Sequence, residues 1–579
     1  METPITVTQE KGRRLRGAAL GAVLTALMLT LLLEALDQTI VGTALPRIIG
    51  TLQGFDRYIW AVTAYTLASS TLIPVVGKLS DQFGRKWFLI VGALIFLAGS
   101  AASGASQTMT QLIAFRAVQG LGAGIGIALV FTVVGDIFPP AERAKWQGIF
   151  GAVYGFSSVV GPTLGGWLTD HGPLLGSLVT DTTRWRWVFY INLPIGALAV
   201  AALLIYLPAN ISVRSSRYSG WAAVRRIDFL GAILAAAATI SLLLGLTWGS
   251  NQIYDWTSVQ VIGALAGAGL LYIAFFLTER FVAEPIVPLD LFRNRVFAVA
   301  SILSLLQLMV LVALVIYLPL FLQGVLGESA TNAGAVITPL TLATVVGAGL
   351  AGFLVATLKR YQLVSIAGAL IMTAGVLLLT RLTPTTSLLE AAIYMAIAGV
   401  GLGTFFSVLT LAAQNALPST RLGVGTGAVR YMGQLGSVLG VAIVGTVVNN
   451  SLADELTPRL HAIAGINFIP PVVVKLATNP QVLTNSDYKN GLIQGVLHQV
   501  PPQFRTNALH TFAQIFDALK QSLSVSIVHG FVVVLIFSGL TLLFTLLLKD
   551  VPLKKTYDEA PAGVPASESG QAEAAPLGR

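Results

Sequence analysis

Cysteine is absent from this sequence of 579 residues, and charged side chains are scarce. Without cysteine, the chain can form neither disulfides, thiol nucleophiles nor Cys-based metal sites. Charged residues make up only 11% of the chain, whereas apolar residues make up 55%. A soluble protein of this length exposes far more charge, so the composition indicates an all-α polytopic membrane protein. No nucleophile–base or metal-ligand constellation is visible, and we expect no enzyme, no metal site and no organic cofactor.

Long apolar runs dominate the chain instead. Fourteen of them are long enough to cross a bilayer, which takes roughly 20 apolar residues. The first follows a basic segment, as a signal peptide does, but it is too long for one, and we expect an uncleaved span. The predicted spans are 18–45, 57–77, 87–106, 110–135, 144–168, 187–208, 228–248, 258–278, 296–323, 332–357, 363–381, 388–412, 422–448 and 523–548.

Lys and Arg are distributed unevenly between the two sides of the membrane. The N-terminal segment and every second loop after it carry clusters of them, whereas the short loops on the other side hold only Arg47, Arg57, Arg184, Arg186 and Arg381. This pattern predicts that both termini are cytoplasmic in a multi-pass plasma-membrane protein of the bacterial inner-membrane type. The net charge of +9 is then a topology signal. The basic residues form no single soluble face, so we expect no nucleic-acid partner.

A weak internal repeat predicts the domain organisation. The segment from Gly92 to Gly99 resembles the one from Gly368 to Gly375. The tripeptide Gly-Ala-Val begins at both Gly151 and Gly427. Both pairs are 276 positions apart, as 92 to 368 and 151 to 427 show. Equal offsets favour two parallel six-helix halves facing each other, an arrangement common among secondary transporters.

The remaining segments complete the predicted plan. An extra pair of helices sits between the halves, and one large outer segment is expected to form a helical hairpin, as a lid or a membrane-surface rest. The tail, rich in Ala, Gly, Pro and Ser, is expected to be disordered. The predicted units are a cytoplasmic N-terminus (1–17), an N-terminal bundle (18–208), a linker with two extra helices (209–295), a C-terminal bundle (296–548) that includes the extracellular hairpin (449–522), and a cytoplasmic tail (549–579).

Two carboxylates, Glu34 and Asp37, lie in the first apolar run. An ionised side chain near the membrane centre costs about 3 kcal/mol, so such a residue usually faces a polar cavity. Residues three apart share a helix face, and neighbouring acids resist being charged together, so one of the two is expected to hold a proton. This arrangement is typical of a proton carrier. The alternative is a helix end whose acids reach the headgroups.

Arg116 lies inside the fourth apolar run and needs a partner because its guanidinium is always charged. At 1.5 Å per residue, Arg116 and Asp37 each lie roughly 10 Å below the outer ends of their helices. We therefore predict that they pair. The alternative is an arginine whose head extends to the outer surface.

Charged residues and glycines also gather at the second cytoplasmic turn. Its glycines permit a tight turn, and Asp81 with Arg85 can form a charged latch that Asp136 completes. The predicted latch residues are Gly77, Asp81, Gly84, Arg85, Lys86 and Asp136.

The fifth span is rich in glycine and contains a Gly-Pro step. Such a step removes a backbone donor and favours a bend or a flexible point. The alternative is simple tight packing. The residues concerned are Gly155, Gly161, Pro162, Gly165 and Gly166.

These stretches resemble the signature motifs of the major facilitator superfamily, specifically its fourteen-span drug:proton antiporter branch. The motif segments are Leu36–Pro46, Gly77–Lys86, Arg116–Gly120, Gly161–Gly166 and Trp185–Gly196. The resemblance implies a fold of two six-helix bundles with two inserted helices, and alternating access. It also implies that Asp37 and Arg116 couple transport to protons and that the fifth span is the antiport hinge. Gly42 departs from the family pattern, which usually has Asn there.

The second half carries fewer signals. Met395 stands where the repeat would place Arg116. Arg430 either binds an anionic or zwitterionic substrate or extends to the cytoplasm, and His529 either titrates or is an ordinary polar residue near a helix end. The candidate cavity residues are Gln119, Tyr154, Gln307, Tyr317, Phe321, Phe405, Arg430 and Tyr431.

The sequence therefore predicts a monomeric, proton-coupled multidrug efflux transporter, surrounded by membrane lipids, that exports amphipathic, cationic compounds. Deprotonated Glu34 and Asp37 would offer negative charge to such cations in an aromatic-lined cavity. Two alternatives are open: an exporter of a lipid or lipid-like metabolite, and a transporter-like sensor or scaffold. The buried Arg116 and its acids argue against the scaffold, which has no use for costly intramembrane charge.

Overall fold

The computed structural model describes most of the chain. The predicted N-terminal segment before residue 17 and the tail beyond residue 552 lie outside the described residues, as do the side chains of Tyr154 and Pro162. The described residues are 17–52, 58–176, 179–209, 228–250, 254–282, 285, 287–328, 330–463, 471–484, 486–498 and 500–552.

The described part of the chain is almost entirely helical. The first half contains α1 (Gly17–Leu52), α2 (Tyr58–Phe83), α3 (Arg85–Ala105), α4 (Met109–Ile137), α5 (Pro140–His171), α6 (Trp187–Tyr190) and α7 (Asn192–Tyr206). The middle contributes α9 (Phe229–Ser250) and α10 (Val259–Glu279). The second half contains α11 (Arg295–Gly324), α12 (Ala330–Leu358), α13 (Tyr361–Leu379), α14 (Leu388–Asn415), α15 (Leu422–His461) and α19 (Arg505–Leu546), with short α16 (Pro471–Ala477), α17 (Gln481–Thr484) and α18 (Ser486–Leu497) between the last two.

Thirteen stretches of helix in the described residues are long and apolar enough to cross a membrane. They confirm a polytopic helical membrane protein. The fifth predicted span corresponds to α5, whose 32 residues extend over about 48 Å. That length suffices to cross a bilayer, but α5 is less apolar than the thirteen, so the total of fourteen spans stays a prediction.

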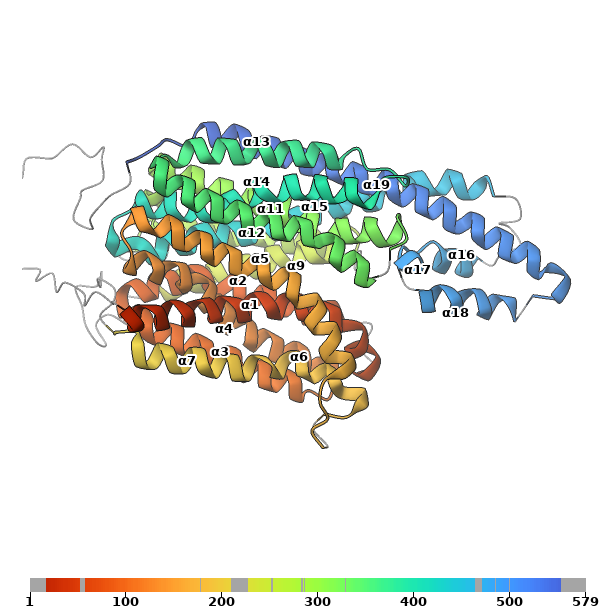
Figure 1. The fold of residues 1–579 in the computed structure, drawn as a ribbon, viewed down its shortest axis with the longest axis horizontal. Coiled ribbons are helices and arrows are strands. Elements are labelled where there is room, and N and C mark those ends of the chain that lie inside the picture. Colours follow the sequence, from red (N-terminus) through yellow and green to blue (C-terminus); the bar gives the residue numbers. More distant parts are fainter. Residues whose placement is uncertain are drawn as a thin grey trace, which may run out of the picture.

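The long helices form two bundles that lie side by side (Figure 1). Helices α1 to α7 make one bundle, and α11 to α15 with α19 make the other. The inserted helices α9 and α10 pack on each other, and α9 also touches both α2 and α15. In Figure 1, α1 begins and α19 ends at the same end of the molecule, whereas α16 to α18 lie at the opposite end. We call the first of these the latch end, because α2 passes into α3 there.

The two bundles repeat one pattern of close helix packing. A Cβ added at Gly122 of α4 would lie 2.3 Å from the backbone nitrogen of Phe96 in α3. A Cβ added at Gly401 of α14 would lie 2.3 Å from the backbone nitrogen of Met372 in α13. Only glycine fits at such contacts, where helix backbones approach each other closely. The same correspondence relates Gly120 to Gly399 and Gly124 to Gly403, whose added Cβ atoms would meet the carbonyl oxygens of Tyr65, Leu340, Ser69 and Thr344.

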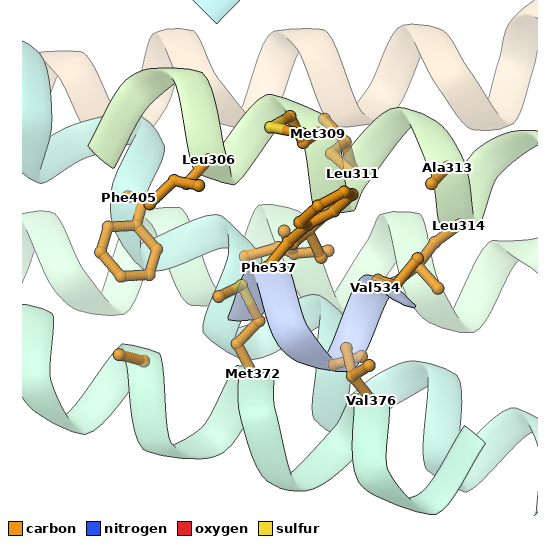
Figure 2. Packing of buried hydrophobic residues seen from close by; sticks show 14 of the residues in the cluster. Leu306, Met309, Leu311, Ala313, Leu314, Met372, Val376, Phe405, Val534 and Phe537 are labelled. Atoms are coloured by element: carbon orange, nitrogen blue, oxygen red, sulfur yellow. The ribbon is translucent and has the colours of Figure 1, made fainter. Parts of the chain in front are cut away.

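The core of the second bundle is apolar where the first bundle carries charge. Leucine, methionine, valine and phenylalanine side chains from α11, α13, α14 and α19 fill it (Figure 2). Met395 is fully buried in this core. The glycine contacts relate α4 to α14 at an offset of 279, as 122 to 401 shows, whereas the offset of 276 would place Ala392 opposite Arg116. At the offset of the contacts Met395 corresponds to Arg116, so the second half has a neutral thioether in place of the guanidinium.

The segment predicted as an outer hairpin is built from extensions of two membrane helices. Helices α15 and α19 have 40 and 42 residues, about twice what a bilayer requires. Their extensions pack with α16 to α18 around a small apolar core that includes Leu456, Phe512 and Phe516. In Figure 1 this assembly projects beyond the first bundle, at the end opposite to the latch end. Its action as a lid or a surface rest stays a prediction.

The glycine contacts generate a testable prediction about stability. Gly401→Ala forces a methyl group against the α13 backbone, and overpacking of this kind costs about 1–3 kcal/mol. We expect a lower thermal unfolding temperature for the purified variant in detergent. Gly263→Ala in α10 is the matched control because an added Cβ there meets nothing within 4 Å. Equal unfolding temperatures for the two variants would contradict the proposed contact.

Candidate functional site

Asp37 of α1 is held inside the first bundle by three side-chain donors. Arg116 of α4 forms an ion pair with it, and both residues are at most 1% exposed. Gln119 donates through Nε2 to Asp37 Oδ1 at 2.8 Å and accepts from Arg116 Nη1 at 2.8 Å. Asn192 of α7 donates to the same carboxylate oxygen at 3.3 Å. The structure thus brings together Asp37 and Arg116, as the depth argument predicts, and adds two amides to the pair.

Arg116 has further partners that offset its loss of hydration. Its Nε donates to the carbonyl oxygen of Ala61 in α2 at 3.2 Å. The guanidinium carbon lies 4.2 Å from the ring centre of Tyr65 and 5.9 Å from that of Phe189. The guanidinium is therefore enclosed by α1, α2, α4 and α6 and does not extend to the surface, so the alternative of an outward-reaching arginine is wrong.

Glu34 does not share the surroundings of Asp37. Its Oε1 packs against Gly126 of α4, where no side chain would fit, and its Oε2 has no hydrogen-bond partner. Glu34 is 4% exposed and lines a cavity between the bundles. Three helical steps turn the chain by about 300°, which leaves two side chains about 60° apart. That angle is enough to direct Asp37 into the bundle and Glu34 toward the second bundle, so the two acids have different partners. That one of them holds a proton stays a prediction.

The cavity draws its walls from both bundles. Its interior volume is about 80 Å³, which suits a few water molecules, whereas drug-sized ligands fill roughly 300–1,000 Å³. A large ligand therefore requires the bundles to move apart. The walls are formed by Leu31, Glu34, Ala35, Gln38, Ile127, Phe131, Gly151, Ser304, Gln307, Leu308, Phe405, Phe406, Leu409, Thr410, Arg430, Gly433 and Gln434.

Of the predicted cavity residues, Gln307, Phe405 and Arg430 line this cavity. Sequence reasoning placed Glu34 of α1 in the cavity but missed Gln38 on the same helix and Phe131 of α4. A signal was present for Gln38, which lies four positions after Glu34 and hence on the same helix face.

Three of the predicted cavity residues lie elsewhere. Gln119 is part of the Asp37 network. Phe321 is fully buried in the core of the second bundle, and Tyr317 packs against that core with its hydroxyl beside Gly445. An aromatic residue in a membrane helix can face any neighbour, and composition alone did not distinguish these directions.

Tyr431 is also absent from the cavity wall. Its hydroxyl bonds to the hydroxyls of Thr239 in α9 and Tyr272 in α10. It therefore fastens the inserted pair to α15. His529 lies outside the cavity wall as well and pairs through Nδ1 with the hydroxyl of Ser451 at 2.7 Å. Among the described residues, no group of three acids or histidines is placed to hold a metal ion.

The latch residues meet where α2 turns into α3. Gly84 makes the turn with a φ of 97°, in the region that favours glycine. Arg85 forms ion pairs with Asp81 and, through Nε at 2.9 Å, with Asp136 of α4. Its Nη1 also donates to the hydroxyl of Ser80 at 2.7 Å. The charged cluster predicted from the spacing is therefore assembled in the structure, with Arg85 at most 1% exposed.

Asp81 also reaches across to the second bundle. Its two carboxylate oxygens accept from the backbone N–H groups of Gly423 at 2.9 Å and Val424 at 2.8 Å, in the first turn of α15. A carboxylate there satisfies open N–H groups and favours the positive end of the helix dipole. An added Cβ at Gly77 would lie 2.8 Å from the carbonyl oxygen of Gly423, so the bundles touch.

Lys86 is the exception within the predicted latch. Its ammonium donates to the carbonyl oxygen of Leu204 near the end of α7 at 2.8 Å. It therefore supports the first bundle, and it is not one of the cross-bundle contacts. Its neighbour Arg85 points to the acids instead because consecutive helical residues diverge by about 100°.

A glutamine pair makes a second contact between the bundles. Gln147 of α5 donates to Gln414 of α14 at 2.9 Å. Gln414 in turn donates to the hydroxyl of Thr426 at 2.9 Å and to the carbonyl oxygen of Phe131 at 3.1 Å. Together with the Asp81 contact, this pair closes the latch end of the molecule in the present conformation.

The glycine-rich α5 contacts both bundles. An added Cβ at Gly155 would meet Val345 of α12 at 2.3 Å, and one at Gly161 would collide with the hydroxyl of Thr39 in α1. The carbonyl oxygens of Gly165 and Gly166 accept from one threonine hydroxyl on the next turn. Glycine therefore permits close packing on either side, and a hinge in α5 stays a prediction.

Comparisons with known proteins agree with this geometry. A sequence profile of the Major Facilitator Superfamily matches residues 27–441. The chain is 35% identical over 546 residues to the multidrug transporter protein MdtP of Bacillus subtilis (strain 168), across 93% of this chain and 95% of that protein. It is 38% identical over 445 residues to the multidrug resistance protein 3 of the same organism, across 76% of this chain and 82% of that protein.

Solved structures show the same fold at much lower identity. The human organic anion transporter MFSD10 (TETRAN) superposes with a TM-score of 0.55 at 14% identity, over 92% of this chain and 100% of that chain. The proton:xylose symporter XylE superposes with a TM-score of 0.53 at 14% identity, over 74% of this chain and 89% of that chain. Both likenesses concern the fold alone.

The capping of α15 by Asp81 yields a prediction about conformation. Asp81→Asn removes the charge that holds Arg85 and the α15 N–H groups, so states open at the latch end should gain population. The chain has no native cysteine. A cysteine introduced in place of Gln434 should therefore react at least about fivefold faster with an impermeant maleimide from that side.

The control for this experiment is Asp290→Asn. Asp290 pairs with Arg421 close to the start of α15, but both side chains are about half exposed, and such pairs contribute little. Its labelling should equal that of the parent protein. Unchanged labelling in Asp81→Asn, together with normal transport, would rule out the latch.

Proposed function

Because the chain belongs to the Major Facilitator Superfamily, we propose that it is a proton-coupled multidrug efflux transporter of the fourteen-span drug:proton antiporter branch. It exports amphipathic, cationic compounds by alternating access. The observation that carries this proposal is the buried Asp37–Arg116 pair, next to a second acid, Glu34, that faces a cavity between the bundles. The names of the two bacterial relatives, which describe multidrug transport and multidrug resistance, support multidrug efflux.

Asp37 is the proposed proton carrier. As a carboxylate it balances Arg116 and accepts from Gln119 and Asn192. A proton on Asp37 removes the charge that Arg116 needs, so α1 and α4 must rearrange to satisfy the guanidinium again. Protonation thereby favours a different packing of the first bundle, which is how a proton gradient can do conformational work.

The latch supplies the other element of alternating access. In the present conformation, Asp81 and the Gln147–Gln414 pair hold the bundles together at one end. Opening that end requires these contacts to separate while contacts at the other end form. Glu34 and the cavity lie between the two ends, where a substrate can be exposed to each side in turn.

The proposed orientation follows the distribution of Lys and Arg. The latch end carries Arg85, Lys86, Arg143, Lys359 and Arg360, and basic loops face the cytoplasm. Both termini are then cytoplasmic, and the α16 to α18 assembly is extracellular, in a plasma membrane of the bacterial inner-membrane type. The protein works as a monomer with protons as its coupling ion and needs no other cofactor.

The coupling role of Asp37 can be tested with Asp37→Asn. Asparagine keeps the shape and one acceptor oxygen but cannot gain or lose a proton. Reconstituted in liposomes, this variant should lose efflux driven by an imposed pH gradient and keep downhill flux of the same substrate. Loss of one partner of a buried pair costs about 3–5 kcal/mol, so the unfolding temperature of each variant is measured in parallel. Asp37→Glu, which restores a titratable group, should recover part of the gradient-driven efflux.

Asp170→Asn is the matched control for the coupling test. Asp170 also pairs with an arginine, Arg47, but both side chains are at least half exposed. Its gradient-driven efflux should equal that of the parent protein. Full gradient-driven efflux by Asp37→Asn would refute the assignment, and Glu34 or His529 would then be the candidate proton carrier.

A further inference from the structure

The cavity between the bundles is lined by one acid and one base, one from each bundle. Glu34 comes from α1 of the first bundle, and Arg430 comes from α15 of the second. The neutral polar groups between them are amides and hydroxyls, from Gln38, Gln307, Gln434, Ser304 and Thr410. Three phenylalanine rings, of Phe131, Phe405 and Phe406, complete an aromatic surface. The combination of two opposite charges with apolar rings restricts which ligands the cavity can accommodate.

Arg430 is fixed in place by groups of both bundles. Its Nη2 donates to the hydroxyl of Thr410 in α14 at 3.2 Å. Its guanidinium carbon lies 3.7 Å from the ring centre of Phe131 in α4, a cation–π contact across the bundle interface. These two contacts orient the guanidinium in the cavity wall. A guanidinium remains charged at any physiological pH and binds carboxylate groups through two parallel hydrogen bonds.

When ionised, Glu34 presents the opposite charge to the same space. It is 4% exposed, and its Oε2 has no hydrogen-bond partner. A buried carboxylate oxygen without a donor is costly unless a ligand supplies one. An amine or another cationic group in the cavity would meet that requirement.

We propose that the cavity is a two-point site for amphipathic zwitterions, in which the cationic group of the ligand binds Glu34 and its carboxylate binds Arg430. This inference rests on the proposed export function and narrows its substrates from amphipathic cations in general to those that also carry a carboxylate. Aromatic or other apolar parts of the ligand lie against the phenylalanine rings.

Ligands with a single charge fit this site less well. A simple cation gains from Glu34 but meets the permanent charge of Arg430 in a medium of low dielectric constant, where repulsion between like charges is strong. A simple anion gains from Arg430 and meets the carboxylate of Glu34. A zwitterion satisfies both walls and adds no net charge to the membrane interior.

The experiment uses two dyes that differ in one group. Rhodamine B has a cationic chromophore and a free carboxylate, whereas its ethyl ester has the same chromophore and no negative charge. Binding of each dye to the full-length protein in lipid nanodiscs is followed by fluorescence polarisation, with empty nanodiscs as the background. We expect the dissociation constant of the ester to exceed that of rhodamine B about tenfold, which corresponds to ~1.4 kcal/mol.

Variants assign this preference to the arginine. Arg430→Gln should bring the ratio of the two dissociation constants close to one, mainly by weakening rhodamine B. Arg430→Lys should keep part of the ratio. Thr410→Val removes only the hydroxyl that orients Arg430 and should lower the ratio less than Arg430→Gln does. It replaces Arg430→Gln in the test if that variant does not fold. Arg360→Gln removes an exposed arginine outside the cavity and should leave the ratio unchanged.

Three results would overturn the proposal: equal or tighter binding of the ester by the parent protein, no binding of rhodamine B, or equal weakening of both dyes in Arg430→Gln. Transport is measured separately in liposomes with a pH gradient. If the protein binds rhodamine B more tightly than the ester but exports neither dye in a pH gradient, the proposed function is refuted and the two-point site remains intact. Export of the ester alone, with equal binding of the two dyes, would refute the two-point site and leave the proposed export function intact.

Discussion

A guanidinium cannot be left unpaired in a membrane interior, and the first bundle is arranged around that constraint. Arg116 is enclosed by a carboxylate, an amide, a backbone carbonyl and two aromatic rings from four helices. Removing one partner of such a pair costs about 3–5 kcal/mol, more than most single contacts contribute. The positions of α1, α2, α4 and α6 are therefore fixed relative to one another as long as Asp37 stays charged. A proton on Asp37 is the smallest change that can release this constraint.

The second bundle shares the packing of the first but has no such constraint. Gly401 repeats the contact of Gly122, yet Met395 and its apolar neighbours replace the charged network (Figure 2). A core of this kind gains stability from contact area alone and has no protonation state to respond with. The asymmetry gives the first bundle a buried ion pair where the second bundle has apolar contacts. It leaves Arg430, at the surface of the other half, as that half's charged group in the cavity wall.

Apolar runs and charge depth were enough to predict much of this structure from the sequence. Most helices match a predicted span, although α15 and α19 continue well beyond theirs. The pairing of Arg116 with Asp37 was predicted because both lie at one depth. The directions in which side chains point were harder to predict from the sequence. A rotation of about 60° separates Glu34 from Asp37. Phe321 and Tyr431 face the core of the second bundle and the inserted helices, and not the cavity. The contact between Asp81 and Val424 was beyond reach for another reason: it joins residues 343 positions apart and depends on which end of the molecule is closed.

The Asp81 contacts and the Asp37–Arg116 pair differ in strength, and this difference separates their roles. The bonds from Gly423 and Val424 to Asp81 resemble helix caps, which contribute about 0.5–2 kcal/mol each. Coupling energies between ligand sites are typically 1–3 kcal/mol, so substrate or proton binding is sufficient to open and close such a contact. The Asp37–Arg116 pair is too costly to break by binding energy of that size while both groups are charged. In the proposed transport cycle the charge of this pair therefore changes first: protonation rearranges the first bundle, and the weaker latch responds to that rearrangement.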